Sequence, residues 1–178
     1  MADDWTSRCR CGKHTLLWCS ESWILTVSER RALTSAQNSM LRRIAGLRRK
    51  EDQDWPEWIR TSTHRARSAA RHAGVRFWEA EQLRKKWEWA GHVARMDSAR
   101  IARRVMEWRD AEWQKSEQDH MSHRHSLRIC RPFRTHWFRW EDQLRKMAQS
   151  SGWDSWKSLA RQKDVWALAK KDFVNFFR

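Results

Sequence analysis

The side chains with the most versatile chemistry are cysteines and histidines, and they lie in two clusters. In the first, Cys9, Cys11, His14 and Cys19 offer the thiolate and imidazole donors that bind zinc. Zinc knuckles and ribbons separate their first two thiols by about two to four residues, so that both point at one ion. Only one residue separates Cys9 from Cys11, and an extended chain would point their thiols to opposite sides. We therefore expect unliganded cysteines here, with metal binding as the alternative.

The second cluster comprises His120, His123, His125 and Cys130, within residues 116–134, where helical spacing disappears. No second pair of ligands with a standard zinc spacing follows it. A solvated, basic, His-rich loop is the expected structure, and zinc binding is again the alternative. We expect no metal and no cofactor.

Two carboxylates near the N-terminus, Asp3 and Asp4, are the remaining candidates for catalysis. A two-metal polymerase site needs such acids on a rigid strand turn, with a third acid from elsewhere, and the sequence offers neither. No phosphate-binding loop, GxSxG elbow or Ser-His-Asp arrangement is present either. We expect no catalytic residue and no enzymatic activity, while polymerase chemistry at Asp3 and Asp4 is the competing hypothesis.

Positive charge is the feature that recurs along the chain. The 178 residues include 37 Lys or Arg and 22 Asp or Glu, which gives a formal net charge of +15. Clusters of basic residues lie beside apolar helical stripes, at Arg42-Arg43, Arg48–Lys50, Arg65–Arg71, Arg84–Lys86, Arg103-Arg104, Arg131–Arg139 and Lys170-Lys171. Such clusters pair with phosphates and release counterions, which favours non-specific binding to a nucleic-acid backbone.

Aromatic composition leaves a second function open. The chain has 15 Trp and no Tyr, and the large rings fall on helical stripes, so a single Trp is expected more often in the core than on a surface that stacks bases, which is the alternative. Trp and Arg on amphipathic helices also describe a protein that binds the surface of a membrane. No window approaches the ~20 apolar residues that a spanning helix needs, and no signal peptide is evident, so we expect no membrane span and an intracellular location, nuclear or cytoplasmic.

These residues must be positioned by helices. We expect a mainly α fold, a helical bundle of about five to seven helices, with a short strand or hairpin near the N-terminus at residues 15–26. Helical spacing covers residues 28–46, 54–74, 75–95, a run from 98, and after the loop 137–152 and 154–176. A chain of this length is one domain or two small ones. We divide it into an N-terminal remnant, a basic helical segment, the His-rich loop and C-terminal helices, at 1–27, 28–115, 116–134 and 135–178.

Local signals mark several helix ends. Ser28 is the expected N-cap of the first helix, and Asp54, with Glu57 three residues later, is that of the second. Gly74 and Gly152 are the expected stops, because glycine readily adopts the left-handed conformation that ends many helices.

Five short phrases resemble, in the same order, the region after the polymerase core of LINE-type, non-LTR retrotransposon reverse transcriptases. Leu16–Thr26 (LLWCSESWILT) is similar to "LLYGSETWTLT", and Leu41–Gly46 (LRRIAG) to "LRRILG". Leu83–Met96 (LRKKWEWAGHVARM) resembles "RRLRWLGHVLRM". Arg131-Pro132 followed by Trp140-Glu141-Asp142 is similar to "GRPRKRWEDDL", and Trp156–Trp166 to the closing "W…LAQDRDRW". Trp18 and Cys19 depart from the family's Tyr and Gly, as does Cys130 from its Gly.

The resemblance implies a truncated, thumb and post-thumb helical region without the catalytic palm aspartates, or a decayed element copy without a function. Such a region grips an RNA or RNA–DNA duplex, and the missing polymerase core is a second implied partner. From this resemblance and the basic clusters we predict backbone contacts by ten residues: Arg42, Arg43, Arg48, Arg49, Lys85, Lys86, His92, Arg95, Arg131 and Arg134.

Overall fold

The computed structural model describes residues 16–108 and 140–177, and these are mainly helical, as predicted. Seven α-helices and one short 3-10 helix account for the regular structure of these two ranges, which contain no strand. The strand expected at 15–26 is replaced, over 16–26, by the 3-10 helix η1 (Ser20–Ser22). Cys19 has a φ of 53°, and its carbonyl accepts a 2.8 Å hydrogen bond from Ser22 Oγ, so the chain turns instead of extending. Residues 1–15 lie outside the described part.

Helix α2 (Val27–Ile44) begins two residues earlier than the sequence predicts. Its N-cap is Thr26 and not Ser28, because Thr26 completes a capping box with Glu29. The Glu29 amide donates to Thr26 Oγ1 at 3.2 Å, and the Thr26 amide donates to Glu29 Oε2 at 2.7 Å. These bonds satisfy two donors that a helix start leaves free. The Thr26 amide, together with the Thr26 hydroxyl, which donates to Glu29 Oε2 at 2.7 Å, holds the Glu29 pKa below its usual value.

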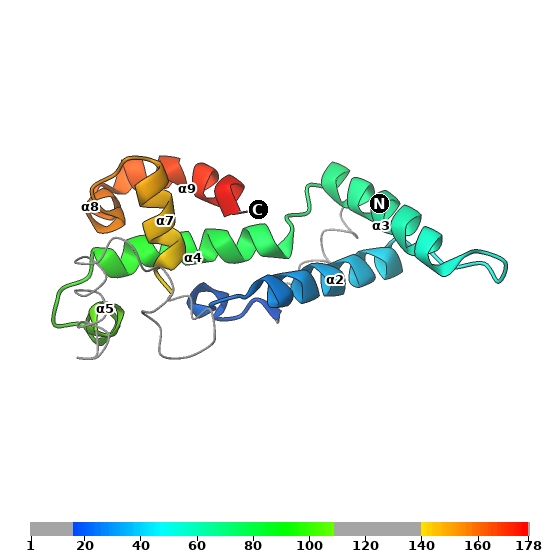
Figure 1. Cartoon of the computed structure of the whole chain (residues 1–178), viewed down its shortest axis with the longest axis horizontal. Coiled ribbons are helices and arrows are strands. Elements are labelled where there is room, and N and C mark those ends of the chain that lie inside the picture. The colour runs from blue at the N-terminus through cyan, green and yellow to red at the C-terminus, as the bar shows by residue number, and fades with distance from the viewer. Residues whose placement is uncertain (1–15, 109–139, 178) are drawn as a thin grey trace, which may run out of the picture.

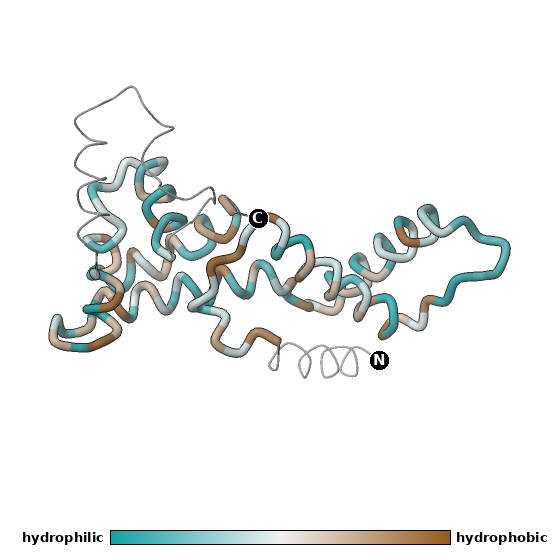
Figure 2. The backbone as a smooth tube through the Cα atoms, turned by 60° about the horizontal axis from the view of Figure 1, so that its bottom comes forward, coloured by the Kyte–Doolittle hydropathy of each residue, from teal (hydrophilic) through white to brown (hydrophobic). Residues whose placement is uncertain are grey.

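Helix α3 (Trp55–His72) starts and stops where the sequence predicts. Asp54 is its N-cap, with the Glu57 amide donating to Asp54 Oδ2 at 3.1 Å, and Gly74 ends it with a φ of 67°. α2 and α3 pack against each other around Leu41, Ala66, Ala70 and Phe77. Together they form a helical hairpin, called here the α2–α3 hairpin, which extends to one end of the molecule (Figure 1). The loop at its tip is hydrophilic throughout (Figure 2).

Helix α4 (Trp78–Ala94) is the central element of the molecule. Helices α7 (Asp142–Ser150), α8 (Trp156–Arg161) and α9 (Lys163–Phe177) lie on one side of it, and α2 lies on the other (Figure 1). Short helix α5 (Ile101–Glu107) follows α4. The start expected at Ser98 is three residues too early, since the Ala99 amide donates to Asp97 Oδ1 at 2.8 Å and forms a turn there. The predicted stop at Gly152, with a φ of 69°, is confirmed.

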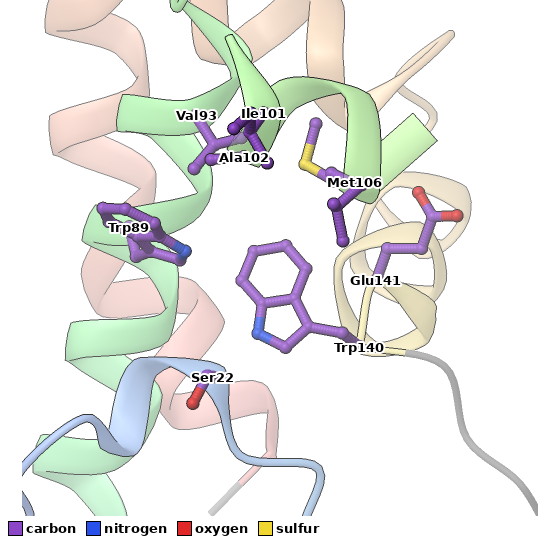
Figure 3. A pocket seen from close by; sticks show the side chains of 9 residues that line it. Ser22, Trp89, Val93, Ile101, Ala102, Met106, Trp140 and Glu141 are labelled. Carbon is purple, nitrogen blue, oxygen red and sulfur yellow. The ribbon is translucent and has the colours of Figure 1, made fainter. Parts of the chain in front are cut away.

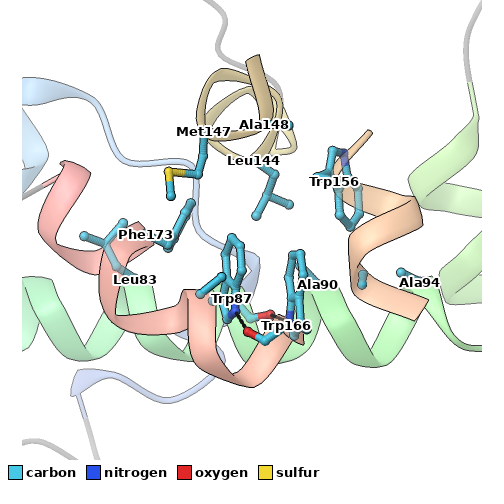
Figure 4. Close-up of a cluster of buried hydrophobic side chains, with 12 residues drawn as sticks. Leu83, Trp87, Ala90, Ala94, Leu144, Met147, Ala148, Trp156, Trp166 and Phe173 are labelled. Carbon is cyan, nitrogen blue, oxygen red and sulfur yellow. Dashed lines mark hydrogen bonds between the residues drawn. The ribbon is translucent and has the colours of Figure 1, made fainter. Parts of the chain in front are cut away.

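Two tryptophans form the centre of the main core, called here the α4–α9 core. The Trp87 and Trp166 rings stack with centroids 3.6 Å apart and an interplanar angle of 5°. Each indole Nε1 donates to the other residue's carbonyl, at 2.9 and 3.1 Å (Figure 4). Gly91 permits this approach, because a Cβ there would overlap the Trp166 indole. The pair is therefore fixed in both position and orientation.

The turn around η1 is attached to α4 and α7 by bonds between distant parts of the chain. Lys85 Nζ donates to the Leu17 carbonyl at 2.7 Å, and Gln82 Nε2 donates to the Ser20 carbonyl at 3.1 Å. Trp140, which lies 119 residues after Glu21 and just before α7, donates from its Nε1 to the Glu21 carbonyl at 2.7 Å. Residues 17–21, Gln82, Lys85 and Trp140, which are far apart in the sequence, thus meet in one packed unit.

None of the helices in the described ranges combines the length and the apolar character required to cross a bilayer.

Candidate nucleic-acid interface

An arginine-lined groove lies between α2 and α3 and reaches the C-terminal end of α9. It has a volume of about 930 Å³. Its lining includes six arginines, Arg30, Arg31, Arg42, Arg60, Arg67 and Arg71, together with His64. Glu79 is the one carboxylate among the groove's lining residues. With His64 neutral, the lining has a formal charge of +5, and we call this feature the arginine groove.

Helical spacing places these side chains on two facing surfaces. On α3, Arg60, His64, Arg67 and Arg71 follow at intervals of four, three and four residues, which is one face of a helix. On α2 the same intervals relate Arg31, Ser35, Asn38 and Arg42, and these residues also line the groove. Because the small residues Ala66 and Ala70 form the α3 side of the hairpin core, the two helices approach closely and their arginines share one space.

Contacts within the protein orient Arg42 and Arg67. Arg42 Nη1 donates to Thr63 Oγ1 at 2.8 Å, and Arg67 Nη1 donates to Asn38 Oδ1 at 3.1 Å. The Arg67 guanidinium also lies 4.3 Å from the centroid of the Phe77 ring. Each of these pairs joins α2 to α3 or fixes a guanidinium against an aromatic face, so the charges are held in place before any ligand arrives.

Arg30 connects the groove to α9 and to α4. Its Nη1 donates to the Phe177 carbonyl at 2.9 Å and lies 3.6 Å from Glu79 Oε1. The single carboxylate of the lining is therefore beside Arg30, at one end of the groove. Arg31, Arg60 and Arg71 are exposed, and the Arg71 guanidinium lies 5.9 Å from the centroid of the Phe77 ring.

Among the ten residues predicted from sequence, Arg42 is the one that the structure places in the arginine groove. Arg43 is exposed in the last turn of α2, and Arg48 is exposed in the loop that follows. Arg49 Nε donates to the Gln53 carbonyl at 2.8 Å, and its guanidinium lies 5.6 Å from the Trp55 ring centroid. These three residues lie on the same hairpin as the groove, near its tip.

Three predicted residues have structural contacts elsewhere. Lys86 is 1% exposed, and its Nζ donates to Gln143 Oε1 at 2.7 Å. Burial lowers the Lys86 pKa to about 8, partly offset by the charge of nearby Asp142. Lys85 is bonded to η1, as described above, and Arg95 Nη1 donates to the Ala160 carbonyl at 2.6 Å. Lys86 is thus covered by protein, and we leave all three out of the proposed interface.

Three of the ten predicted residues remain to be placed. His92 is exposed and lies beside Trp89, with ring centroids 5.5 Å apart. Arg131 and Arg134 lie outside the described residues.

Five of the six groove arginines, all except Arg42, were not selected from sequence. The usable signal was the repeated spacing of basic residues on α3, since Arg60, His64, Arg67 and Arg71 fall on one helical face. Contiguous basic clusters favour pairs such as Arg42-Arg43 as backbone contacts, yet residues that are neighbours in sequence point to different sides of a helix.

In the part of the chain that the structure describes, no group of three or more His, Cys, Asp or Glu side chains could hold a metal ion. Cys19 is exposed there as a free thiol. The other members of its cluster, Cys9, Cys11 and His14, and the whole second cluster lie outside the described residues, so neither the expected unliganded cysteines nor the zinc alternative is tested there.

A second cavity, of about 490 Å³, is chemically different from the arginine groove. Apolar side chains of α4 and α5 line it together with Trp140, as Figure 3 shows for Trp89, Val93, Ile101 and Met106. Its acidic residue, Glu141, is 3% exposed and pairs with Arg145 at 3.0 Å. The cavity therefore offers shape and apolar surface instead of charge.

Comparison of the chain with protein-family models, curated proteins and solved structures found no match. The functional interpretation consequently rests on the arginine groove and on the residues that line it.

Proposed function

We propose that the chain binds the sugar-phosphate backbone of RNA, or of an RNA–DNA duplex, without sequence specificity, through the arginine groove. The observation that carries this proposal is the lining itself, six arginines on two facing helices with one carboxylate. A concave surface with that charge raises the local concentration of polyanions and accelerates their association.

Arginine suits this task better than lysine. Its planar guanidinium donates two parallel hydrogen bonds to phosphate oxygens, and it stays charged across the physiological pH range. Oriented groups such as Arg42 and Arg67 lose less conformational entropy on binding than free side chains. Contacts to phosphate and sugar carry no base information, so the expected binding is insensitive to sequence.

The resemblance to LINE-type reverse transcriptases supports the same role. In that family the corresponding region grips template and primer while another domain performs the chemistry. We propose that this chain is such a thumb and post-thumb region, acting without catalysis in the nucleus or cytoplasm and able to contact a polymerase core.

The membrane-surface alternative requires arginines and exposed apolar residues on the same helices. In the described ranges, strongly exposed apolar residues include Ile101 and Val105 on α5, at 76% and 68%. α5 also carries Arg103 and Arg104, so it combines both residue types, but it lies outside the groove, whose basic side chains come from α2 and α3. Nucleic acid is favoured because the facing arginines of α2 and α3 line a concave surface, whereas α5 has only seven residues.

The proposal is tested by charge reversal inside and outside the groove. Arg31→Glu with Arg60→Glu removes two exposed groove charges, and the control pair, Arg104→Glu with Arg161→Glu, makes the same change in net charge on exposed arginines of α5 and α8. Fluorescence anisotropy with a labelled blunt RNA duplex measures affinity at low salt. We expect the groove variant to bind about tenfold weaker or more, and the control to stay within about threefold of wild type.

Equal losses in the two variants would show that only net charge matters and would remove the groove assignment. Preferential capture of wild type by anionic liposomes over duplex RNA at matched salt would replace this proposal with the membrane one.

A further inference from the structure

We propose that a second subsite beside the arginine groove stacks an unpaired base on Trp55. The inference rests on the proposed function, since the backbone of that nucleotide continues into the groove. We call Trp55 and Trp58, with the guanidinium groups of Arg42 and Arg49, the tryptophan platform. The ligand class is a nucleic acid with a single-stranded segment next to its duplex.

Exposure distinguishes Trp55 from the tryptophans of the α4–α9 core. Trp87, Trp156 and Trp166 are at most 4% exposed, whereas Trp55 is 56% exposed at the start of α3. Its ring packs against that of Trp58, with centroids 5.2 Å apart and an interplanar angle of 39°. An indole that is more than half exposed retains surface for another aromatic group.

The platform is continuous with the arginine groove. The Arg42 guanidinium lines the groove and also lies 5.6 Å from the centroid of the Trp58 ring. On the other side, the Arg49 guanidinium lies 5.6 Å from the Trp55 ring centroid. One path therefore leads from the groove through Arg42, Trp58 and Trp55 to Arg49, with a cation on either side of two packed rings.

Two packed rings with a cation on either side match the bases and flanking phosphates of a single strand. Every base has a π-face, so stacking on an aromatic side chain is independent of sequence, and neighbouring cations pair with the flanking phosphates. A base inside a duplex is already stacked on both sides and cannot reach the indole. The platform should therefore favour an unpaired nucleotide over a base pair.

A structural role for the same residues makes a different prediction. Arg49 also bonds the Gln53 carbonyl, so the Trp55 ring and Arg49 could simply stabilise the loop between α2 and α3. In that case the loss of Trp55 would change stability, but it would not change any preference between ligands that differ only in their bases.

The test compares two ligands with identical phosphates. One is an RNA duplex with a five-nucleotide 3′ uridine overhang, and the other carries an abasic overhang of the same length. We expect wild type to bind the uridine overhang about five- to tenfold tighter than the abasic one, and Trp55→Ala to bind both equally, at the wild-type affinity for the abasic ligand. Trp55→Phe should retain part of the preference, and Trp18→Ala, which removes another exposed indole (75% exposed), should retain all of it.

The outcomes separate the two proposals. If wild type binds both overhangs equally, the platform is not a base-stacking site while the arginine groove stands. A preference that persists in Trp55→Ala assigns stacking to another residue and overturns the inference. Failure of wild type to bind either ligand at low salt would overturn the proposed function and this inference with it.

Discussion

The α2–α3 hairpin and the α4–α9 core use the same residue types for opposite purposes. Four buried residues form the hairpin core, and twelve form the main one. The hairpin carries its arginines outward around a groove, while the α4–α9 core buries Trp87, Trp156 and Trp166. A protein rich in Trp and Arg can therefore keep stability and polyanion binding in different regions, and composition does not reveal which residue serves which.

Cations show the same division. Lys86 is buried and bonded to Gln143, whereas Arg31 and Arg60 are exposed on facing helices. Removing an exposed charge should change binding with little effect on stability, and removing a buried ring or amine should do the reverse. Two substitutions test this contrast, one at a buried ring and one at a buried amine.

The largest expected effect is on the α4–α9 core. Trp166→Ala removes a stacked ring and the hydrogen bond that Trp166 Nε1 donates to the Trp87 carbonyl, and we expect the free energy of unfolding to fall by about 4 kcal/mol. Urea denaturation followed by circular dichroism measures it. Leu168→Ala, at a residue of α9 that is 79% exposed, is the control and should cost less than about 0.5 kcal/mol. A similar loss in the Arg31→Glu, Arg60→Glu variant would erase the distinction between the two regions.

A smaller effect concerns the pH dependence of stability. The folded pKa of Lys86 is about 8, below the ordinary value of 10.5, because burial disfavours its charge. Between these values the unfolded chain holds a proton that the folded chain has released, so stability rises with pH. From pH 8 to pH 10 we expect a contribution of about 2 kcal/mol.

Lys86→Met should remove this contribution and raise stability at pH 7, as measured by urea denaturation at each pH. An unchanged pH dependence in Lys86→Met would mean that the amine is solvated and available to a ligand, and Lys86 would return to the list of candidate contacts.

Local signals explain how much of the fold was predictable. Asp54, Gly74 and Gly152 are the cap and the stops that their residue types suggest, because a cap or a left-handed glycine depends on a few neighbouring residues. η1 is different, since its turn is held by Lys85 and Gln82 of α4, more than sixty residues later. A pattern within residues 15–26 contains no trace of those partners.

The candidate site was less predictable for the same reason. The sequence indicates that arginines cluster, but the groove exists only because α2 and α3 pack together and bring Arg31 and Arg60 into one lining. The sequence predicts that Lys86 contacts the nucleic-acid backbone. Its burial beside Gln143 has no signal in the neighbouring residues, because Gln143 lies 57 residues later.

Salt dependence tests the central claim most directly. Binding of wild type to blunt RNA duplex should weaken about 10³-fold between 50 and 200 mM salt if six or so phosphates are neutralised. In Arg31→Glu with Arg60→Glu, the slope of log affinity against log salt should be shallower by about 2, while Arg104→Glu with Arg161→Glu keeps the wild-type slope. Equal slopes in the two variants, or wild-type binding that salt leaves unchanged, would contradict the assignment of phosphate binding to the arginine groove.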